Sequence, residues 1–481
     1  MLRPSSYMFL LMLVSIDLLF GCGSITNPTP APTPTANSFP VVVFSDLHFD
    51  PFYDPTLFTK YPTFCTTAHP SQWESFFHSS QVNTASAWGY DTNYPLLVLA
   101  LTSIRQNLGA SPVVIYTGDL IGHNFASSFY QYCEGLAPSQ TPSSQNIAAM
   151  QVFTDKTVTF VTAQIREYVG NLPVVFAVGN IDSYTGYGPD STFLANNAES
   201  FYSQFVKGTV DHQTFLNTFT AGGYYSAQPL GSNLMVIALN TNSFAIGVPG
   251  DNDSAIATEL AWLDSSLASA QAAGQKVWLL MHVPPGANTV STAANIIPGQ
   301  PVSASMMMYQ SYQTSLLQIL AKYPNLITMT LGAHTHMDEY RILSPSIVLD
   351  EVPAISSCFG DNPAYKIFTL AHNTLAPTGY TALNYDLSFM PLQFNNNYTF
   401  STAYSIRGSL GASLLQLYPE LATGIPLTSQ PANAQQTLYK DQYLSGDNLG
   451  VNPKSGELWN PITNANWPVF ACGIGKMAQL D

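Results

Sequence analysis

The stretch LPVVFAVGNIDSY, residues 172–184, runs from a continuous apolar segment into glycine, asparagine, isoleucine and aspartate. An apolar run without alternation predicts a strand that is buried on both faces of a sheet. The polar residues follow where this strand ends, and α/β proteins place ligand-binding side chains at such points. Asn180 therefore lies where a ligand-binding side chain is expected, whereas Ile181 beside it has no evident polar role.

Other apolar runs of the same character recur along the chain, with helix-like segments between them. The runs are FPVVVFS from Phe39, PVVIYT from Pro112, NLMVIAL from Asn233, KVWLLM from Lys276 and NLITMTL from Asn325. The helix-like segments are residues 96–108, 162–171, 254–274 and 311–323. This alternation predicts an α/β domain over residues 39–375. Periodicity weakens after residue 375, and we expect a helical C-terminal subdomain over residues 376–481.

The composition limits the class of partner. The chain has 481 residues, enough for a sizeable core, and 14 Lys+Arg against 29 Asp+Glu give a formal charge of −15. Its few basic residues form no run or stripe. Because nucleic-acid binding needs a basic surface, a nucleic-acid polymer is not expected as a partner.

The N-terminus predicts export. Arg3 precedes the apolar stretch YMFLLMLVSIDLLF, which closes on Gly21 and Cys22, so residues 1–21 form a signal peptide in outline. The letters LFGC resemble a bacterial lipobox, in which the cysteine is lipidated; an ordinary secretory signal cut nearby is the alternative. Residues 22–38 are rich in proline and threonine and predict an extended tether. We expect a monomer that is a cell-envelope lipoprotein or a secreted protein, with membrane contact through the lipid of the lipoprotein form.

Four cysteines remain beyond Cys22, an even number in an oxidising compartment. Two disulfides are expected, and three pairings are possible. We favour Cys65 with Cys133 and Cys358 with Cys472.

Carboxylate, amide and imidazole side chains follow five of the predicted strands. They are Asp46 and His48, Asp119 and His123, Asn180, His282, and His334 and His336. A carboxylate can bridge two divalent ions about 3.5–4 Å apart, which hold a hydroxide nucleophile between them, while imidazoles and an amide complete the ligand set. Oxygen and nitrogen ligands without thiolate favour Zn, with Mn or Fe also possible.

The order of these motifs resembles the calcineurin-like metallophosphoesterases. The blocks are Asp-x-His, Gly-Asp, Gly-Asn, a lone His and His-x-His. The longer stretches SDLHFDP, GDLIGH, MHVPPG and GAHTHMDEY resemble the branch of acid sphingomyelinase and the sphingomyelinase-like phosphodiesterases. The resemblance covers residue 39 to the end, and it implies a four-layer α/β/β/α sandwich with a small helical C-terminal subdomain.

The resemblance also implies roles for individual residues. One ion would be held by Asp46, His48, Asp119 and His336, and the other by Asn180, His282, His334 and the bridging Asp119. His123 would contact the substrate phosphate as a candidate proton donor; the alternative is an ordinary loop histidine.

Ile181 departs from the family pattern, which has histidine beside the ligand asparagine. In one interpretation the protein is a phosphodiesterase acting on a phosphodiester or phosphoanhydride, in a sphingomyelin-like lipid or a nucleotide, and either His123 donates the proton or the leaving group needs little protonation. In the other it is a metal-loaded lipoprotein that binds phosphate esters with reduced or lost turnover. A phosphomonoesterase with the same site is a third possibility.

Overall fold

The computed structural model describes residues 37–188, 190–248, 253–296, 302–406, 408–423, 433–446, 448, 450–452 and 455–478. The predicted signal peptide, Cys22 and the tether up to residue 36 lie outside the described residues. Among the helices that are described, none has the length and apolarity needed to cross a bilayer.

The first sheet contains three of the predicted strands. It consists of β1 (Ser38–Phe44), β2 (Val114–Tyr116), β3 (Val174–Phe176), β10 (Ala364–Ala371), β11 (Pro377–Asn384) and β12 (Asn395–Thr399). The strand order is β12-β11-β10-β1-β2-β3. Strands β1, β2 and β3 run parallel, whereas β10 pairs antiparallel with β1 and continues through β11 to β12 as a meander.

The second sheet contains the other three predicted strands. It consists of β4 (Tyr225–Ala227), β5 (Leu234–Ala238), β6 (Lys276–Leu280), β7 (Ile327–Gly332), β8 (Tyr340–Ser344) and β9 (Ile347–Glu351). The order is β4-β5-β6-β7-β9-β8, with antiparallel strands only at the two edges. All six apolar runs therefore form strands, as predicted.

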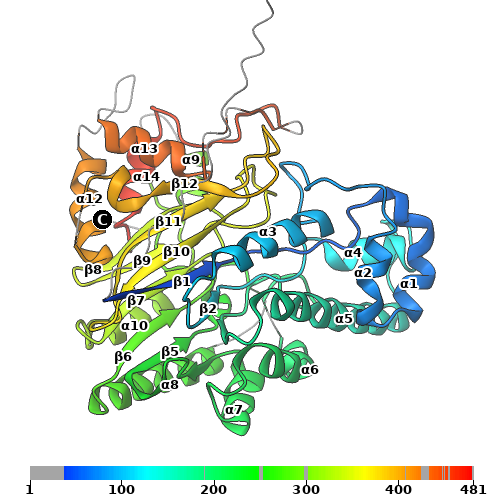
Figure 1. The fold of residues 1–481 in the computed structure, drawn as a ribbon, viewed down its shortest axis with the longest axis horizontal. Helices are drawn as coiled ribbons and strands as arrows, with labels where there is room; N and C mark the ends of the chain where they lie inside the picture. The colour runs from blue at the N-terminus through cyan, green and yellow to red at the C-terminus, as the bar shows by residue number, and fades with distance from the viewer. Residues whose placement is uncertain are drawn as a thin grey trace, which may run out of the picture.

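Each face of the second sheet packs into a different hydrophobic core. Along β6, Trp278 and Leu280 join the core shared with the first sheet, while Val277 and Leu279 join a core with α8 (Asp253–Ala272) and α10 (Gln310–Ala321). This alternation with a period of two places the two sheets face to face, with α8 and α10 outside (Figure 1).

Helices also cover the outer face of the first sheet. Ser103 of α3 (Tyr94–Asn107) hydrogen-bonds Tyr365 of β10 at 2.8 Å between hydroxyl oxygens, and α3 packs against the long α5 (Ser144–Val169). The predicted four-layer α/β/β/α sandwich is thus confirmed. The remaining helices before the C-terminal region are α1 (Tyr61–Thr67), α2 (Trp73–Phe77), α4 (Phe125–Tyr132), α6 (Ser191–Phe201), α7 (His212–Gly222) and α9 (Thr289–Ala294).

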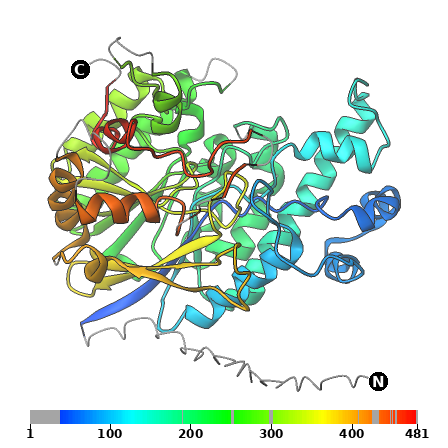
Figure 2. The ribbon, with the colours of Figure 1, turned by 90° about the horizontal axis from the view of Figure 1, so that it is seen from above.

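The C-terminal region begins with strands. Residue 375, where we expected a helical region to begin, lies between the paired strands β10 and β11, so the sheet extends to Thr399. Helices α11 (Phe400–Ala403), α12 (Leu410–Ala422), α13 (Ala434–Gln442) and α14 (Trp467–Gly473) follow. Helix α12 contacts β9 and β11 and so closes one edge of the sandwich. These helices, orange to red, gather at the left of Figures 1 and 2, opposite α1, α2 and α4.

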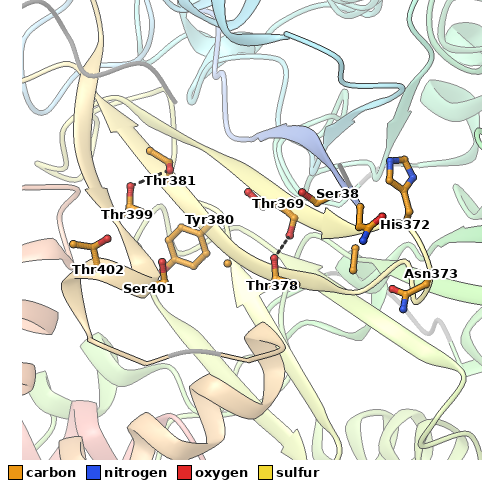
Figure 3. Close-up of a pocket in the computed structure, with 13 residues that line it drawn as sticks. Ser38, Thr369, His372, Asn373, Thr378, Tyr380, Thr381, Thr399, Ser401 and Thr402 are labelled. Atoms are coloured by element: carbon orange, nitrogen blue, oxygen red, sulfur yellow. Dashed lines mark hydrogen bonds between the residues drawn. The ribbon is translucent and has the colours of Figure 1, made fainter. Parts of the chain in front are cut away.

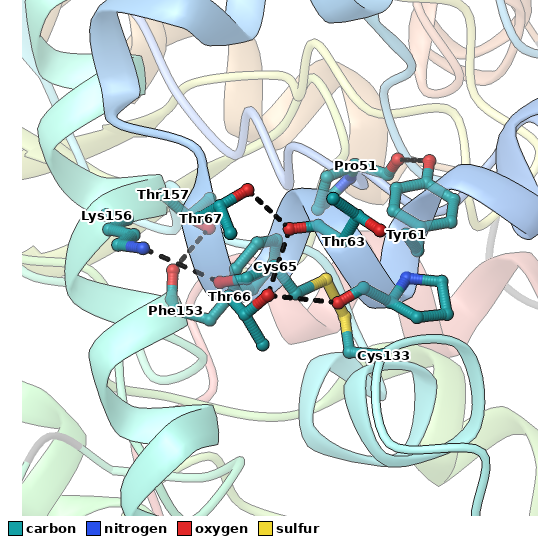
Figure 4. The surroundings of a disulfide bond; sticks show 11 residues. Pro51, Tyr61, Thr63, Cys65, Thr66, Thr67, Cys133, Phe153, Lys156 and Thr157 are labelled. Atoms are coloured by element: carbon teal, nitrogen blue, oxygen red, sulfur yellow. Dashed lines mark hydrogen bonds between the residues drawn. A yellow bond between two sulfur atoms is a disulfide. The ribbon is translucent and has the colours of Figure 1, made fainter.

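One of the two expected disulfides is present. Cys65 on α1 is bonded to Cys133 at the end of α4, which confirms that pairing (Figure 4). The expected bond between Cys358 and Cys472 is wrong, because both cysteines are free. Cys358 lies in the loop after β9, with its sulfur 3.8 Å from Nδ1 of His336, whereas Cys472 is exposed on α14.

Candidate metal centre

The structure brings the seven predicted metal ligands together where five strands end. Backbone hydrogen bonds join the loops: the amide of Asp46 donates to the carbonyl of Gly118 at 2.9 Å, and the amide of His48 donates to that of Asp119 at 2.9 Å. The loops after β1 and β2 therefore form one rigid unit. The ligands follow β1 (Asp46, His48), β2 (Asp119), β3 (Asn180), β6 (His282) and β7 (His334, His336).

Close backbone approach explains the glycine before Asp119 and the glycine before Asn180. A Cβ atom added at Gly179 would lie 1.9 Å from Oδ1 of Asp119, and one added at Gly118 would lie 2.8 Å from Nδ1 of His282. Gly118 also has a φ of 111°, which disfavours any side chain. Both glycines are therefore needed for the ligand loops to meet.

The first group of ligand atoms surrounds Oδ1 of Asp46. Nε2 of His48 lies 3.7 Å from this oxygen, and Nε2 of His336 lies 3.5 Å from it. The two imidazole nitrogens are 3.1 Å apart, and Oδ2 of Asp119 lies 3.3 Å from Nε2 of His48. These are the four residues expected at one ion.

The second group shares the same Asp119 oxygen. Its Oδ2 lies 3.1 Å from Nε2 of His282. Oδ1 of Asn180 lies 2.8 Å from that nitrogen and 2.7 Å from Nδ1 of His334. One carboxylate oxygen of Asp119 thus stands between the two groups, in the place of a bridging ligand.

The donor atoms fit divalent cations. Metal–nitrogen bonds of about 2.0–2.1 Å place the ligand atoms of a tetrahedral zinc site about 3.3 Å apart, close to the separations seen here. Both side-chain oxygens of Asp46 are buried, and neither has a hydrogen-bond partner among the described residues. A charged carboxylate that is buried without hydrogen bonds raises the free energy of the folded state unless a cation compensates its charge.

Hydrogen bonds from the backbone orient two of the imidazoles. Nδ1 of His48 lies 3.1 Å from the carbonyl oxygen of Ile121, and Nδ1 of His282 lies 2.8 Å from that of Thr117. In the neutral ring, donation from Nδ1 leaves the lone pair of Nε2 turned toward the other ligand atoms. Both rings are therefore held in the tautomer that binds a metal.

The buried carboxylates dominate the electrostatics of the site. Burial works against the charged form of His48, yet Asp119 and Asp46 raise its pKa to about 10. In the same way Asp119 outweighs burial and raises the pKa of His282 to about 9. Burial lowers the pKa of His336 to about 3. The two carboxylates thus attract positive charge, which is what bound divalent cations supply.

Five of the seven ligands have an unusual backbone conformation. Asp46, His48, Asp119, His334 and His336 have φ values of 48°, 42°, 64°, 75° and 68°. Left-handed backbone at residues with side chains is uncommon and tends to collect at functional sites. The local strain points to selection for side-chain placement.

His123 lies beside the centre, and the structure adds a partner that the sequence analysis missed. Its ring stacks on that of His48, with 4.1 Å between centroids. Nδ1 of His123 lies 3.0 Å from Oδ1 of Asp91, and the His123 amide donates to Oδ2 of Asp91 at 2.6 Å. Although burial raises the pKa of Asp91, the hydrogen bond from His123 and the charge of His48 bring it to about 2. Asp91 follows no apolar run, so no sequence signal marked it.

Asp182 supports the loops that carry the ligands. Its carboxylate accepts hydrogen bonds from the backbone amides of Asp119, Leu120 and Gly179 at 3.1, 2.7 and 2.9 Å. Ile181 contributes its own amide, which donates to Oδ1 of Asp119 at 2.8 Å, while its side chain is buried in the core. The backbone at Ile181 thus positions the bridging carboxylate without any imidazole.

A pocket of about 340 Å³ opens over Asp119, His123, Asn180 and His334. Its walls are mainly uncharged, and none of the described lining residues is Lys or Arg. They include Val290, Met307, Phe359, Tyr443 and Trp459. A larger cavity of about 660 Å³ lies at the opposite ends of the strands and is lined by Ser, Thr and Tyr hydroxyls, far from the metal ligands (Figure 3).

Comparison with known proteins shows that the chain is similar in sequence to proteins named as phosphodiesterases. No family model matches it. Sphingomyelin phosphodiesterase B of Dictyostelium discoideum is 27% identical, over 94% of this chain and 66% of that protein. Human sphingomyelin phosphodiesterase is 26% identical, over 60% of this chain and 42% of that protein. The chain thus spans less than two thirds of either relative.

A further relative in sequence and a solved structure were also found. Cyclic GMP-AMP phosphodiesterase SMPDL3A of Rattus norvegicus is 25% identical, over 79% of this chain and 80% of that protein. A solved dimetal phosphatase from Danio rerio has a TM-score of 0.40 and 12% identity, covering 73% of this chain and 96% of that one. The sequence relatives confirm the resemblance stated from the motif blocks: the chain is similar to sphingomyelin phosphodiesterases and to a cyclic GMP-AMP phosphodiesterase, and so resembles the sphingomyelinase-like branch of the calcineurin-like metallophosphoesterases.

Proposed function

We propose that the chain is a metal-dependent phosphodiesterase that hydrolyses a phosphodiester or phosphoanhydride. The observation that carries the proposal is the pair of ligand groups that share Oδ2 of Asp119. Relatives named for sphingomyelin and for cyclic GMP-AMP support a small phosphodiester or a phospholipid as the substrate. The uncharged walls of the pocket are compatible with either class.

The residues divide the chemistry between them. Two divalent ions bound by the two groups would neutralise charge on the phosphate and lower the pKa of an attacking water. Asp91 engages Nδ1 of His123, so Nε2 of His123 is the nitrogen available to protonate the leaving oxygen. Asp182 and the Ile181 amide hold Asp119 in place during the reaction.

The finer parts of the proposal concern metal, location and assembly. Histidine, carboxylate and amide ligands favour Zn, with Mn or Fe as alternatives. The signal peptide at residues 1–21, lipidation at Cys22 and the tether favour an exported protein, held at the cell envelope or secreted. We expect a monomer.

A binding protein with lost turnover is the second candidate, and Ile181 is the observation that favours it. Its side chain, 8% exposed, provides no group that could protonate a leaving oxygen. In that case the site would hold metal and phosphate esters without cleaving them.

Hydrolysis of bis(p-nitrophenyl) phosphate by the mature chain, loaded with Zn or Mn, tests the proposal. We expect turnover that a chelator abolishes and that Asp119→Asn lowers at least 10²-fold, an order-of-magnitude estimate for a lost bridging ligand. Asp211→Asn is the matched control, because Asp211 only caps α7 at the surface. Bound metal without turnover would favour the binding protein, and turnover that ignores the chelator would contradict both.

A further inference from the structure

The connection between β11 and β12 exposes an unusual amount of apolar surface. In this loop, residues 385–394, Phe389 is 83% exposed, Met390 49% and Leu392 98%. Single exposed apolar residues are common, but three of them within four positions of one loop concentrate apolar surface, and concentrated apolar surface marks interaction sites.

The loop is also held in shape. Leu387 and Phe394, which flank the exposed residues, are buried in the core. The Met390 amide donates to the carbonyl of Asp386 at 2.9 Å, and the Ser388 amide donates to the Asp386 side chain at 2.9 Å. The exposed side chains thus project from a backbone turn held by hydrogen bonds, so little backbone conformational entropy is lost when a partner buries them.

The base of the loop is hydrogen-bonded to the segment that follows Phe359, a residue of the pocket wall. The Leu387 amide donates to Oδ1 of Asn362 at 3.1 Å, and the Tyr385 amide donates to the carbonyl of Pro363 at 2.8 Å. Three residues before Asn362 is Phe359, which lines the pocket and is 50% exposed. In Figure 1 the loop lies at the end of the first sheet toward which β1 runs, which is the end that carries the metal ligands.

Charge indicates the kind of surface that the loop can meet. Residues 385–394 contain Asp386 and no Lys or Arg, and the chain as a whole carries a formal charge of −15. An anionic membrane attracts proteins through basic residues, which are lacking here. Among membranes, an electrically neutral one therefore matches this loop better than an anionic one.

We propose that the β11–β12 loop inserts Phe389, Met390 and Leu392 into a zwitterionic phospholipid bilayer. Docking there brings the catalytic pocket to the lipid surface, so the proposal deepens the phosphodiesterase function, on which it rests, by assigning a membrane phosphodiester as the substrate class. Nucleotide substrates would make no use of this loop.

Vesicle binding tests the proposal independently of turnover. The mature chain, with Cys22→Ser so that no acyl group contributes, is sedimented with phosphatidylcholine–sphingomyelin vesicles in the presence of a chelator. We expect the double substitution Phe389→Ser and Leu392→Ser to weaken partitioning at least about tenfold, since burying one such side chain is worth that much. The matched control is Ile147→Ser with Val152→Ser on α5, whose side chains are 41% and 54% exposed.

Several outcomes would overturn the proposal. They are no vesicle binding by the parent chain, equal binding by the loop variant, stronger binding to phosphatidylglycerol vesicles, or loss of a dimer in the loop variant, which would identify the loop as a self-association surface. The metal-loaded variants are also assayed on bis(p-nitrophenyl) phosphate and on vesicle sphingomyelin. If neither the parent nor any variant hydrolyses either substrate, the phosphodiesterase proposal fails, but the sedimentation result still shows whether the loop binds the vesicles.

Discussion

Ile181 is the residue at which this chain departs from the family that it resembles, and it offers a direct test of leaving-group preference. We predict that Ile181→His raises the turnover of an alkyl phosphodiester relative to a nitrophenyl diester by about 10²-fold, because a general acid matters most for a poor leaving group. The measurement is the ratio of the two kcat values. Ile181→Gln, polar but unable to donate a proton in this way, is the control. Unchanged ratios in the histidine variant would show that protonation is not limiting.

Asp91 is predicted to act through His123. Oδ1 of Asp91 faces Nδ1 of His123 at 3.0 Å and also accepts a hydrogen bond from the Ser356 hydroxyl at 3.0 Å. Asp91→Asn should lower kcat about 10- to 100-fold on an alkyl diester and less on a nitrophenyl diester, because a disoriented donor protonates less efficiently.

The double variant of Asp91 and His123 separates positioning from general destabilisation. If Asp91 acts through the imidazole, Asp91→Asn should cost little more once His123→Gln is present. If the two substitutions instead lower kcat by independent factors that multiply in the double variant, Asp91 does not act through proton donation by His123.

At the scale of elements, a buried ion pair links two of the loops that carry ligands. Oε2 of Glu351 on β9 accepts a hydrogen bond from Thr335, between His334 and His336, at 2.9 Å. Oε1 of Glu351 accepts from Nε of Arg341 on β8 at 2.5 Å, and Arg341 also donates to the carbonyl of Ala287 in the loop after β6. Arg341 and Glu351 thus fix the position of the His282 loop relative to the His334–His336 loop.

Removing the charge of Glu351 should therefore loosen the metal. We predict that Glu351→Gln weakens zinc binding about 10- to 100-fold, the range found for residues that orient ligands, as measured by competition with a chromophoric chelator. Glu457→Gln, at an exposed glutamate, is the control. A lower melting temperature with unchanged zinc affinity would limit Glu351 to a structural role.

Some of these elements and ligand residues could be predicted from the sequence, and others could not. The parallel strands were predictable because their apolar runs are continuous, and the ligands were predictable because parallel strands deliver their ends to one edge. The meander β10–β12 was not, since β12 reads NNNYT and carries no apolar alternation. Asp91 was missed because it precedes a helix and does not follow an apolar run. The Cys358–Cys472 pairing was wrong because an even number of cysteines does not show which of them lie close together in the fold.

Across the whole molecule, an acidic chain buries carboxyl groups well away from the metal ligands as well as among them. Glu259 on α8 is 3% exposed, and its Oε1 accepts a hydrogen bond from the Asn240 amide at 2.7 Å. Burial raises its pKa from 4.5 to about 8 in spite of that bond. Burial likewise raises the pKa of Asp50 to about 7. Such groups make the stability of the folded chain depend on pH.

The sign of that dependence follows from proton uptake. Between pH 4.5 and about 8 folded Glu259 keeps a proton that the unfolded chain has released, so its contribution to the free energy of unfolding falls as pH rises, by at most about 1.4 kcal/mol per pH unit. Glu259→Gln cannot ionise and should be free of this loss. We predict that the urea midpoint of the variant, relative to the parent, rises steadily from pH 5 to pH 8, with both proteins in chelator so that titration at the metal ligands cancels. Glu457→Gln, at an exposed glutamate, should keep a constant difference from the parent; a constant difference for Glu259→Gln as well would mean that Glu259 ionises normally in the folded protein.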